Sequence, residues 1–166
     1  MTGVPWYRDR GALRFIALRY LPVLAGLSFA WEWAHVRLYT IWEEADFAYL
    51  AFSVVHCTLG DVLIGASSLV LALMVSGERG SGAWHYGRVA AMSALIGAAY
   101  TVFSEWMNVV VFRSWTYAES MPRLSLGSFE IGLTPLAQWL IIPPVSLYLS
   151  LRRGAGRMLL PGKNRR

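Results

Sequence analysis

Four long apolar segments constrain this chain more than any other feature of its sequence. They cover about residues 15–39, 47–75, 87–112 and 131–151. A helix needs about 20 apolar residues to cross the hydrocarbon core of a bilayer, and each segment is long enough to do so. Because a backbone inside lipid must satisfy its own hydrogen bonds, the segments are expected to be helices. The sequence therefore predicts an all-α integral membrane protein, a four-helix bundle that residues 1–151 form as a single domain.

The composition agrees with a membrane protein. Hydrophobic residues make up 56% of the chain and charged residues 15%, whereas about a quarter of the residues in a soluble domain are charged. The N-terminal region lacks the short apolar stretch and A-x-A pattern of a cleaved signal peptide, so we expect the first segment to be retained. Cys57 is the single cysteine of the sequence, which excludes an internal disulfide and a multi-cysteine metal site.

The positive charges predict an orientation. Twelve of the 15 Lys and Arg residues lie around the start of the first segment, between the second and third segments, or in the tail at 152–166. Because cytoplasmic loops carry the excess of positive charge, we expect an inner-membrane, multi-pass protein with both termini in the cytoplasm and the loops 40–46 and 113–130 outside. The basic tail is expected to lie against anionic membrane lipid. This arrangement explains the net charge of +5 without a nucleic-acid partner.

Two of the loops differ in composition. The stretch "GERGSGAWHYG" at 77–87 is short and rich in glycine, which predicts a plain turn between helices. The stretch "RSWTYAESMPRLSLGSFEIG" at 113–132 is longer and aromatic. It predicts either a lid over the bundle or an aromatic belt at the membrane interface.

Polar side chains occur at a similar depth in all four segments. Glu105 lies at helical spacing from Thr101 and Gly97, and membrane helices approach one another closely along such small-residue stripes. We therefore expect Glu105 to point into the bundle. An ionisable group at this depth costs several kcal/mol unless it is paired or solvated, so a shared cavity open to the outside is the favoured arrangement. The residues expected to meet there are Glu32, His56, Asp61, Glu105, Asn108 and Gln138.

The main hypothesis for function is a membrane-embedded enzyme that performs acid–base chemistry on a hydrophobic, lipid-soluble small molecule. Glu105 and Asp61 are predicted to be the acid or base, with Glu32 and His56 assisting, because such catalysis needs titratable groups in contrasting environments. Aromatic side chains would line the cavity and suit cationic intermediates. The residues expected to bind or orient the substrate are Asn108, Gln138, Trp106, Trp115, Tyr117 and Trp139.

One part of the sequence resembles a known family. The stretch "EWMNVVVFRSWTYAESMP", followed by "GLTPLAQW", presents an acid, then W-x-Y, then a proline at a helix start. This order resembles membrane carotenoid-modifying proteins of the lycopene-cyclase-domain type. The second acid that those proteins carry after the proline is missing here. The resemblance implies an apolar, isoprenoid-like substrate.

Other classes of protein stay open on the sequence alone. A divalent metal is one alternative, with His56, Asp61, Glu32 and Glu105 as candidate ligands, although no metal site or cofactor is assigned. Haem is disfavoured, because His35 and His56 differ in depth. The polar groups could also pair helices in a non-catalytic accessory subunit of a larger membrane complex, with protein partners or a homo-oligomer. A proton or metal-ion pathway would need polar residues that continue to the cytoplasmic side, and the sequence pattern marks none there.

Overall fold

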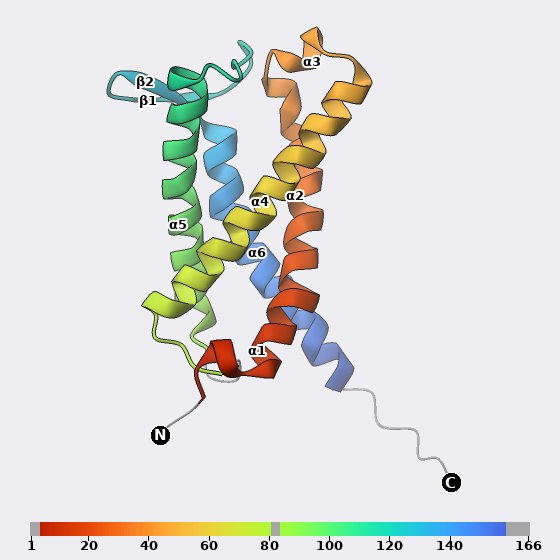
Figure 1. The fold of residues 1–166 in the computed structure, drawn as a ribbon, viewed down its shortest axis with the longest axis vertical. Coiled ribbons are helices and arrows are strands. Elements are labelled where there is room, and N and C mark those ends of the chain that lie inside the picture. Colours follow the sequence, from red (N-terminus) through yellow and green to blue (C-terminus); the bar gives the residue numbers. More distant parts are fainter. Residues whose placement is uncertain (1–3, 81–83, 159–166) are drawn as a thin grey trace.

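Helices that stand side by side make up most of the molecule (Figure 1). The computed structural model describes residues 4–80 and 84–158. The last residues of the basic tail, 159–166, lie outside this part. In chain order the elements are η1 (Trp6–Arg8), α1 (Arg10–Phe15), η2 (Ile16–Tyr20), α2 (Leu21–His35), η3 (Val36–Leu38), α3 (Ile41–Glu44), α4 (Phe47–Val75), α5 (Tyr86–Glu105), η5 (Trp106–Val111), β1 (Arg123–Leu126), β2 (Phe129–Gly132) and α6 (Leu133–Met158).

In the described part of the chain, three helical stretches are long and apolar enough to cross a membrane. The first, Arg10–Leu38, joins α1 to α2 through a π-helical turn; the second is α4; the third, Tyr86–Val111, joins α5 to η5. α4 has the helix bounds predicted from the sequence. Large apolar side chains point away from the bundle on these helices. The prediction of a mostly helical fold is confirmed, and the three long apolar helices are compatible with a membrane protein. The short helices α1 and α3 make the fold more complex than a plain four-helix bundle.

The fourth predicted segment forms α6. This helix begins at Leu133, slightly later than predicted, and Pro135 lies in its first turn, where the missing N–H of proline costs little. α6 continues through Pro143 and Pro144. It packs mainly against α5 and also against α2 (Figure 1). The last predicted segment is therefore an integral part of the helix bundle.

A β-hairpin interrupts the predicted all-α fold between η5 and α6. β1 pairs antiparallel with β2, from Arg123↔Gly132 to Leu126↔Phe129. Gly127 has a left-handed backbone, with φ 63°, at the first position of a two-residue turn, which is where a type II′ hairpin turn requires glycine. The all-α prediction was wrong here, because the Gly-Ser pair between two alternating runs is a hairpin signal that the prediction did not use.

The loop after α4 holds a buried, hydrogen-bonded acid in its described residues, which the plain turn predicted from its composition did not include. The Arg88 guanidinium donates a hydrogen bond to the buried Glu78 carboxylate at 2.9 Å, and the His85 backbone N–H donates another at 3.2 Å. Burial acts to raise the pKa of Glu78, but these hydrogen bonds outweigh it and lower the pKa below its usual value. The Gly80 N–H donates to the Val4 carbonyl at 3.1 Å. A backbone hydrogen bond therefore joins the N-terminal segment to this loop.

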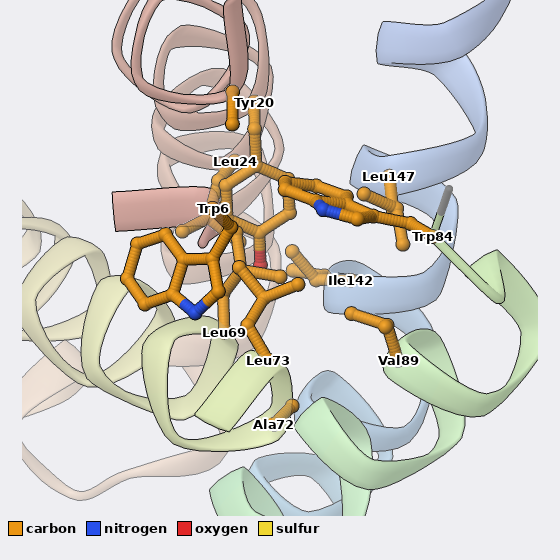
Figure 2. Close-up of a cluster of buried hydrophobic side chains, with 11 residues drawn as sticks. Trp6, Tyr20, Leu24, Leu69, Ala72, Leu73, Trp84, Val89, Ile142 and Leu147 are labelled. Carbon is orange, nitrogen blue, oxygen red and sulfur yellow. The ribbon is translucent and has the colours of Figure 1, made fainter. Parts of the chain in front are cut away.

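A hydrophobic cluster fills the half of the bundle nearer the two termini (Figures 1 and 2). Two glycines allow the helices beside it to approach closely. A Cβ added at Gly65 would lie 2.4 Å from Leu24 Cδ2, and one added at Gly97 would lie 2.3 Å from Trp139 Cε3. Such distances exclude a larger residue unless the neighbour moves. The Leu24 side chain of α2 therefore packs against α4 at Gly65, and the Trp139 side chain of α6 packs against α5 at Gly97.

Candidate functional site

Three carboxyl groups are buried on three different helices. Glu32 of α2, Asp61 of α4 and Glu105 of α5 are 7%, 8% and 5% exposed. Ser28 precedes Glu32 and Thr101 precedes Glu105 by four residues, and the buried Thr58 precedes Asp61 by three. Residues three or four apart share a helix face. The three acids therefore lie on the faces that their helices turn toward the bundle interior.

Asp61 connects three of the helices. Gln138 Nε2 of α6 donates a hydrogen bond to Asp61 Oδ2 at 2.6 Å. Ser28 and Glu32 of α2 also lie within hydrogen-bonding reach of the Asp61 carboxyl. Two carboxyl groups can share a hydrogen bond only when one of them holds a proton. Glu32 and Asp61 are thus placed to share a proton across the α2–α4 interface.

Glu105 has a different partner, which comes from the loop after η5. The Tyr117 hydroxyl donates a hydrogen bond to Glu105 Oε2 and accepts one from the Gly132 N–H at 3.0 Å. The Gly132 backbone lies close to the ring, because an added Cβ there would lie 3.2 Å from Tyr117 Cε1. Burial and the neighbouring Glu105 raise the pKa of Tyr117. The phenol therefore keeps its proton and remains a hydrogen-bond donor to Glu105.

Backbone contacts fix the position of this loop. Arg113 has a left-handed backbone, with φ 53°, which ends η5 and turns the chain back. The Thr40 N–H then donates to the Thr116 carbonyl at 3.0 Å, and Tyr39 pairs with Tyr117 in an isolated β-bridge. The loop is therefore tied to the end of α2, at the end of the bundle opposite the termini (Figure 1). It brings the Tyr117 side chain onto Glu105 from that end.

Two residues near the acids had no predicted role in the site. The Tyr39 ring lies 5.3 Å from the His35 ring, centroid to centroid, and interacts electrostatically with Glu32 and Glu105. Cys57 interacts with the same two carboxyls and with Asp61. A helical-spacing signal was available for Cys57, which precedes Asp61 by one turn. Tyr39 follows η3 in extended backbone, so helical spacing could not have placed it.

His56 is not part of this cluster, which corrects the prediction. Its side chain is exposed and stacks on Phe52 with ring centroids 5.8 Å apart. His56 precedes Asp61 by five residues, which is about 140° around an α-helix at 3.6 residues per turn. Because Asp61 points into the bundle, His56 faces outward. The expected His56–Asp61 partnership is wrong for this geometric reason.

Trp106 and Asn108 also depart from their predicted positions. Trp106 is 41% exposed, and Asn108 Nδ2 donates to the Ser104 carbonyl of its own helix at 2.8 Å. The helix becomes π-helical at Trp106, as the hydrogen bond from the Phe112 N–H to the Met107 carbonyl shows. A π-helical turn contains an extra residue, so the spacing that places Thr101 and Glu105 on one face no longer holds after Glu105.

The other four predicted substrate-binding residues, which include the Tyr117 described above, are at least partly buried. Gln138 binds Asp61, as described. Trp139 is 4% exposed and packs against Gly97. Trp115 is half-buried, and its indole N–H interacts with the Glu105 carboxyl without a hydrogen bond of ordinary geometry in the described part of the chain. Trp115 and Tyr117 thus both approach Glu105 from the loop between η5 and β1.

The candidate metal ligands do not form a site. Among residues 4–80 and 84–158, no three His, Cys, Asp or Glu side chains are arranged to hold a metal ion. Of the four candidate ligands, Glu32 interacts with both Asp61 and Glu105, whereas His56 is exposed. The structure therefore does not support the metal alternative at these residues.

Comparison of this chain with protein-family models, with curated proteins and with solved structures finds no match.

The site can hold and exchange protons. In the described part of the chain, no arginine or lysine lies within ion-pair distance of Glu32, Asp61 or Glu105, and the one basic neighbour is His35, whose Nδ1 lies 3.7 Å from Glu32 Oε1. Like-charged carboxylates in a low-dielectric region repel one another strongly. An arrangement of amide, phenol and acid groups without a fixed cation therefore favours shared protons over three full negative charges.

Proposed function

We propose that the chain spans the inner membrane four times, with both termini in the cytoplasm. α6 supports the fourth span, because it packs along α5 and α2 (Figure 1) and its polar Gln138, Ser146 and Ser150 are buried rather than lipid-facing. η1, the last described turns of α6, the end of α4 and the start of α5 lie at one end of the bundle, whereas α3 and the hairpin lie at the other (Figure 1). The excess of positive charge at the first end supports a cytoplasmic location for it.

Cysteine labelling in intact cells tests this orientation. In a Cys57→Ala background, a cysteine at the exposed position Ser114 is expected to react with a membrane-impermeant maleimide, and a cysteine at the exposed position His85 is expected to react only after the cells are opened. Labelling of the His85→Cys variant alone in intact cells would reverse the proposed topology.

We infer that the protein is an enzyme that uses its carboxyl cluster for acid–base chemistry on a lipid-soluble substrate. One observation carries this proposal: Glu32, Asp61 and Glu105 come from three helices and are buried together. In the part of the chain that the structure describes, their neighbours are amide, hydroxyl, thiol, indole and imidazole groups, with no lysine or arginine within ion-pair distance. Helix pairing alone needs one neutral hydrogen bond rather than several acids. Titratable groups held in different environments are what general acid and base roles require. A substrate would reach these groups from the bilayer or from the outer end.

The proposal predicts loss of activity without loss of fold when an acid becomes its amide. Lipid extracts of cells that express the wild type, Glu105→Gln or Asp61→Asn can be compared by mass spectrometry. We expect at least one lipid-soluble species, isoprenoid or other, to change with the wild type and with neither variant. Glu130→Gln is the matched control, because Glu130 is an exposed acid that pairs with Arg123 at 3.0 Å outside the cluster. It should behave as the wild type.

A second candidate function is an accessory subunit of a larger membrane complex. The exposed His56 favours this alternative, because a polar ring that faces lipid gains a partner when another helix covers it. If none of the lipid species responds to the wild type, and if a His56→Phe substitution releases a partner that otherwise stays bound through purification, the enzyme proposal is wrong and the subunit proposal replaces it.

A further inference from the structure

A groove lies on the side of the bundle between α4 and α5, two helices that pack against each other. Its volume of about 280 Å³ is near the lower limit of about 300 Å³ for small-molecule sites. Both helices belong to stretches that are long and apolar enough to cross a membrane, so the groove faces the bilayer in the proposed topology. Its lining includes Ile64, Ser67, Ser68 and Leu71 of α4 and Ile96 and Tyr100 of α5.

Small residues in α4 explain why the surface is hollow here. Residues 65–68 read Gly-Ala-Ser-Ser, and they lie between the larger Ile64 and Leu71, which also line the groove. On α5, Ile96 and Tyr100 are four residues apart and therefore share one helix face, which forms the opposite wall. Figure 1 shows α4 running obliquely to α5. Side chains as small as those of alanine and serine do not fill the space that such a crossing leaves.

The Ser68 hydroxyl is a buried polar group without a partner. Ser68 is 2% exposed and lines the groove. In the part of the chain that the structure describes, its hydroxyl makes no hydrogen bond, whereas Ser53 and Ser150 each donate to a carbonyl of their own helix. Buried polar groups in proteins are nearly always paired. An oxygen acceptor on a molecule bound in the groove would pair with this hydroxyl.

The lining defines the chemistry of a ligand. Ile64, Leu71 and Ile96 are apolar, and none of the described residues that line the groove carries a charge. A charged headgroup would therefore find no counter-charge at a depth where an unpaired charge is costly. A neutral oxygen, such as that of an alcohol, a ketone or an ester, can accept a hydrogen bond from a serine hydroxyl. The lining thus suits a neutral lipid that has an apolar chain and an oxygen acceptor.

The groove begins close to the acid-bearing part of both helices. Ile64 follows Asp61 by three residues, which is about 4.5 Å of helix. Tyr100 precedes Glu105 by five residues, which is about 7.5 Å. Because α4 and α5 follow each other in the chain and run in opposite directions (Figure 1), both offsets point toward the loop that joins them. The groove and the acid cluster are therefore neighbours along two helices.

We propose that this groove binds a neutral lipid-soluble molecule, with its apolar chain between α4 and α5 and its oxygen bound to the Ser68 hydroxyl. The binding involves no charge and no covalent step, and none of the three acids lines the groove. The part of the chain that extends past Ile64 and Tyr100 would lie at the depth of the acids. A role for the bound molecule as their substrate rests on the proposed function, whereas the binding does not.

Photolabelling of the protein in proteoliposomes tests the site. The probe is a long-chain alcohol that carries a diazirine and an alkyne, and mass spectrometry locates the labels, which we expect to concentrate on residues 63–71 and 96–100. Unlabelled hexadecanol should reduce this labelling several-fold more than hexadecane, because only the alcohol offers an oxygen to Ser68. Ser68→Ala should remove this difference. Ser93→Ala, the same change at a buried serine of α5 that does not line the groove, should keep it.

Filling the groove is an independent test. Ser67→Phe, at an exposed position of the lining, should lower the labelling several-fold, and Leu140→Phe, at an exposed position of α6 outside the groove, should not. If Ser67→Phe does not give a monodisperse protein, the comparison of Ser68→Ala with Ser93→Ala decides alone.

Three outcomes would overturn the proposal: labels spread evenly over the lipid-facing residues of α4, α5 and α6, labelling that Ser67→Phe leaves unchanged, or an equal preference for hexadecanol in the wild type and Ser68→Ala. The first of these is the pattern expected from bulk membrane lipid without a site. Glu105→Gln should keep the groove labelling, because the labelling needs no catalysis. The groove and the proposed enzyme function can therefore fail or survive separately.

Discussion

Replacing Gly97 with alanine is expected to destabilise the helix bundle by about 3 kcal/mol, because overpacking a tight contact forces rigid groups to move. The added Cβ would lie 2.3 Å from one Trp139 ring atom and 2.9 Å from the next. An indole that is 4% exposed has little space into which it can shift. α5 and α6 would therefore have to separate.

Gly60→Ala is the matched control for this substitution. Gly60 lies within α4, and an added Cβ there meets nothing within 4 Å. Alanine stabilises a helix interior by roughly 0.5–1 kcal/mol relative to glycine, so Gly60→Ala should leave stability unchanged or raise it. Thermal unfolding of both variants in detergent measures the difference. Equal losses of stability would show that Gly97 is not at a helix contact.

The second large effect is expected at Gln138. Gln138→Met removes the amide that donates to Asp61 at 2.6 Å and leaves a buried carboxyl without that donor, at a cost of about 1–3 kcal/mol. Asp61→Leu combined with Gln138→Met removes both partners. The double variant should lose clearly less stability than the sum of the two single losses, because a pair of apolar groups needs no hydrogen bond.

Denaturation of all four proteins in one detergent completes this double-mutant cycle. Strict additivity of the two single effects would mean that the Gln138–Asp61 contact contributes nothing to stability. The Gln138→Met variant also tests function, because it leaves Glu32, Asp61 and Glu105 in place. If Gln138 only orients Asp61, its replacement should reduce the proposed acid–base activity without abolishing it.

Much of the helical structure could be predicted because lipid imposes a simple rule on sequence. A long apolar segment inside a bilayer is expected to be helical, because its backbone must satisfy its own hydrogen bonds, and α4 begins and ends where its apolar stretch does. Helical spacing likewise predicted that Glu32, Asp61 and Glu105 are buried. These predictions depend on local periodicity, which a regular α-helix preserves over its whole length.

Predictions failed where the helix departs from that periodicity or where the chain leaves the helices. The π-helical turn after Glu105 rotates Asn108 away from the acid face. His56 lies beside Cys57 and near Asp61 in the sequence, but proximity along a helix is not a shared face. The hydrogen bond between Tyr117 and Glu105 depends on how a loop folds back onto the bundle. The spacing of residues within one helix cannot predict such a contact between a loop and a helix.

The buried hydroxyls of Tyr20, Ser93 and Ser146 were not predicted for a different reason. A hydroxyl in a helix can bond to a carbonyl of the same helix, as Ser150 does, so its presence in the sequence does not show whether it has a partner. The packing alone shows that these three hydroxyls are buried without partners in the described part of the chain.

For the four-span topology proposed above, the interaction between Glu32 and Asp61 has a consequence for how the chain enters the membrane. These acids belong to the first two long helices of the chain, which are joined by the short segment that contains α3. Each helix alone would carry an unpaired acid into hydrocarbon, an unfavourable step during insertion. As an antiparallel pair, α2 and α4 can pair the Glu32 and Asp61 carboxyls with each other before α5 and α6 have been synthesised. The two helices are therefore suited to partition into the bilayer together, as one hairpin, early in biogenesis.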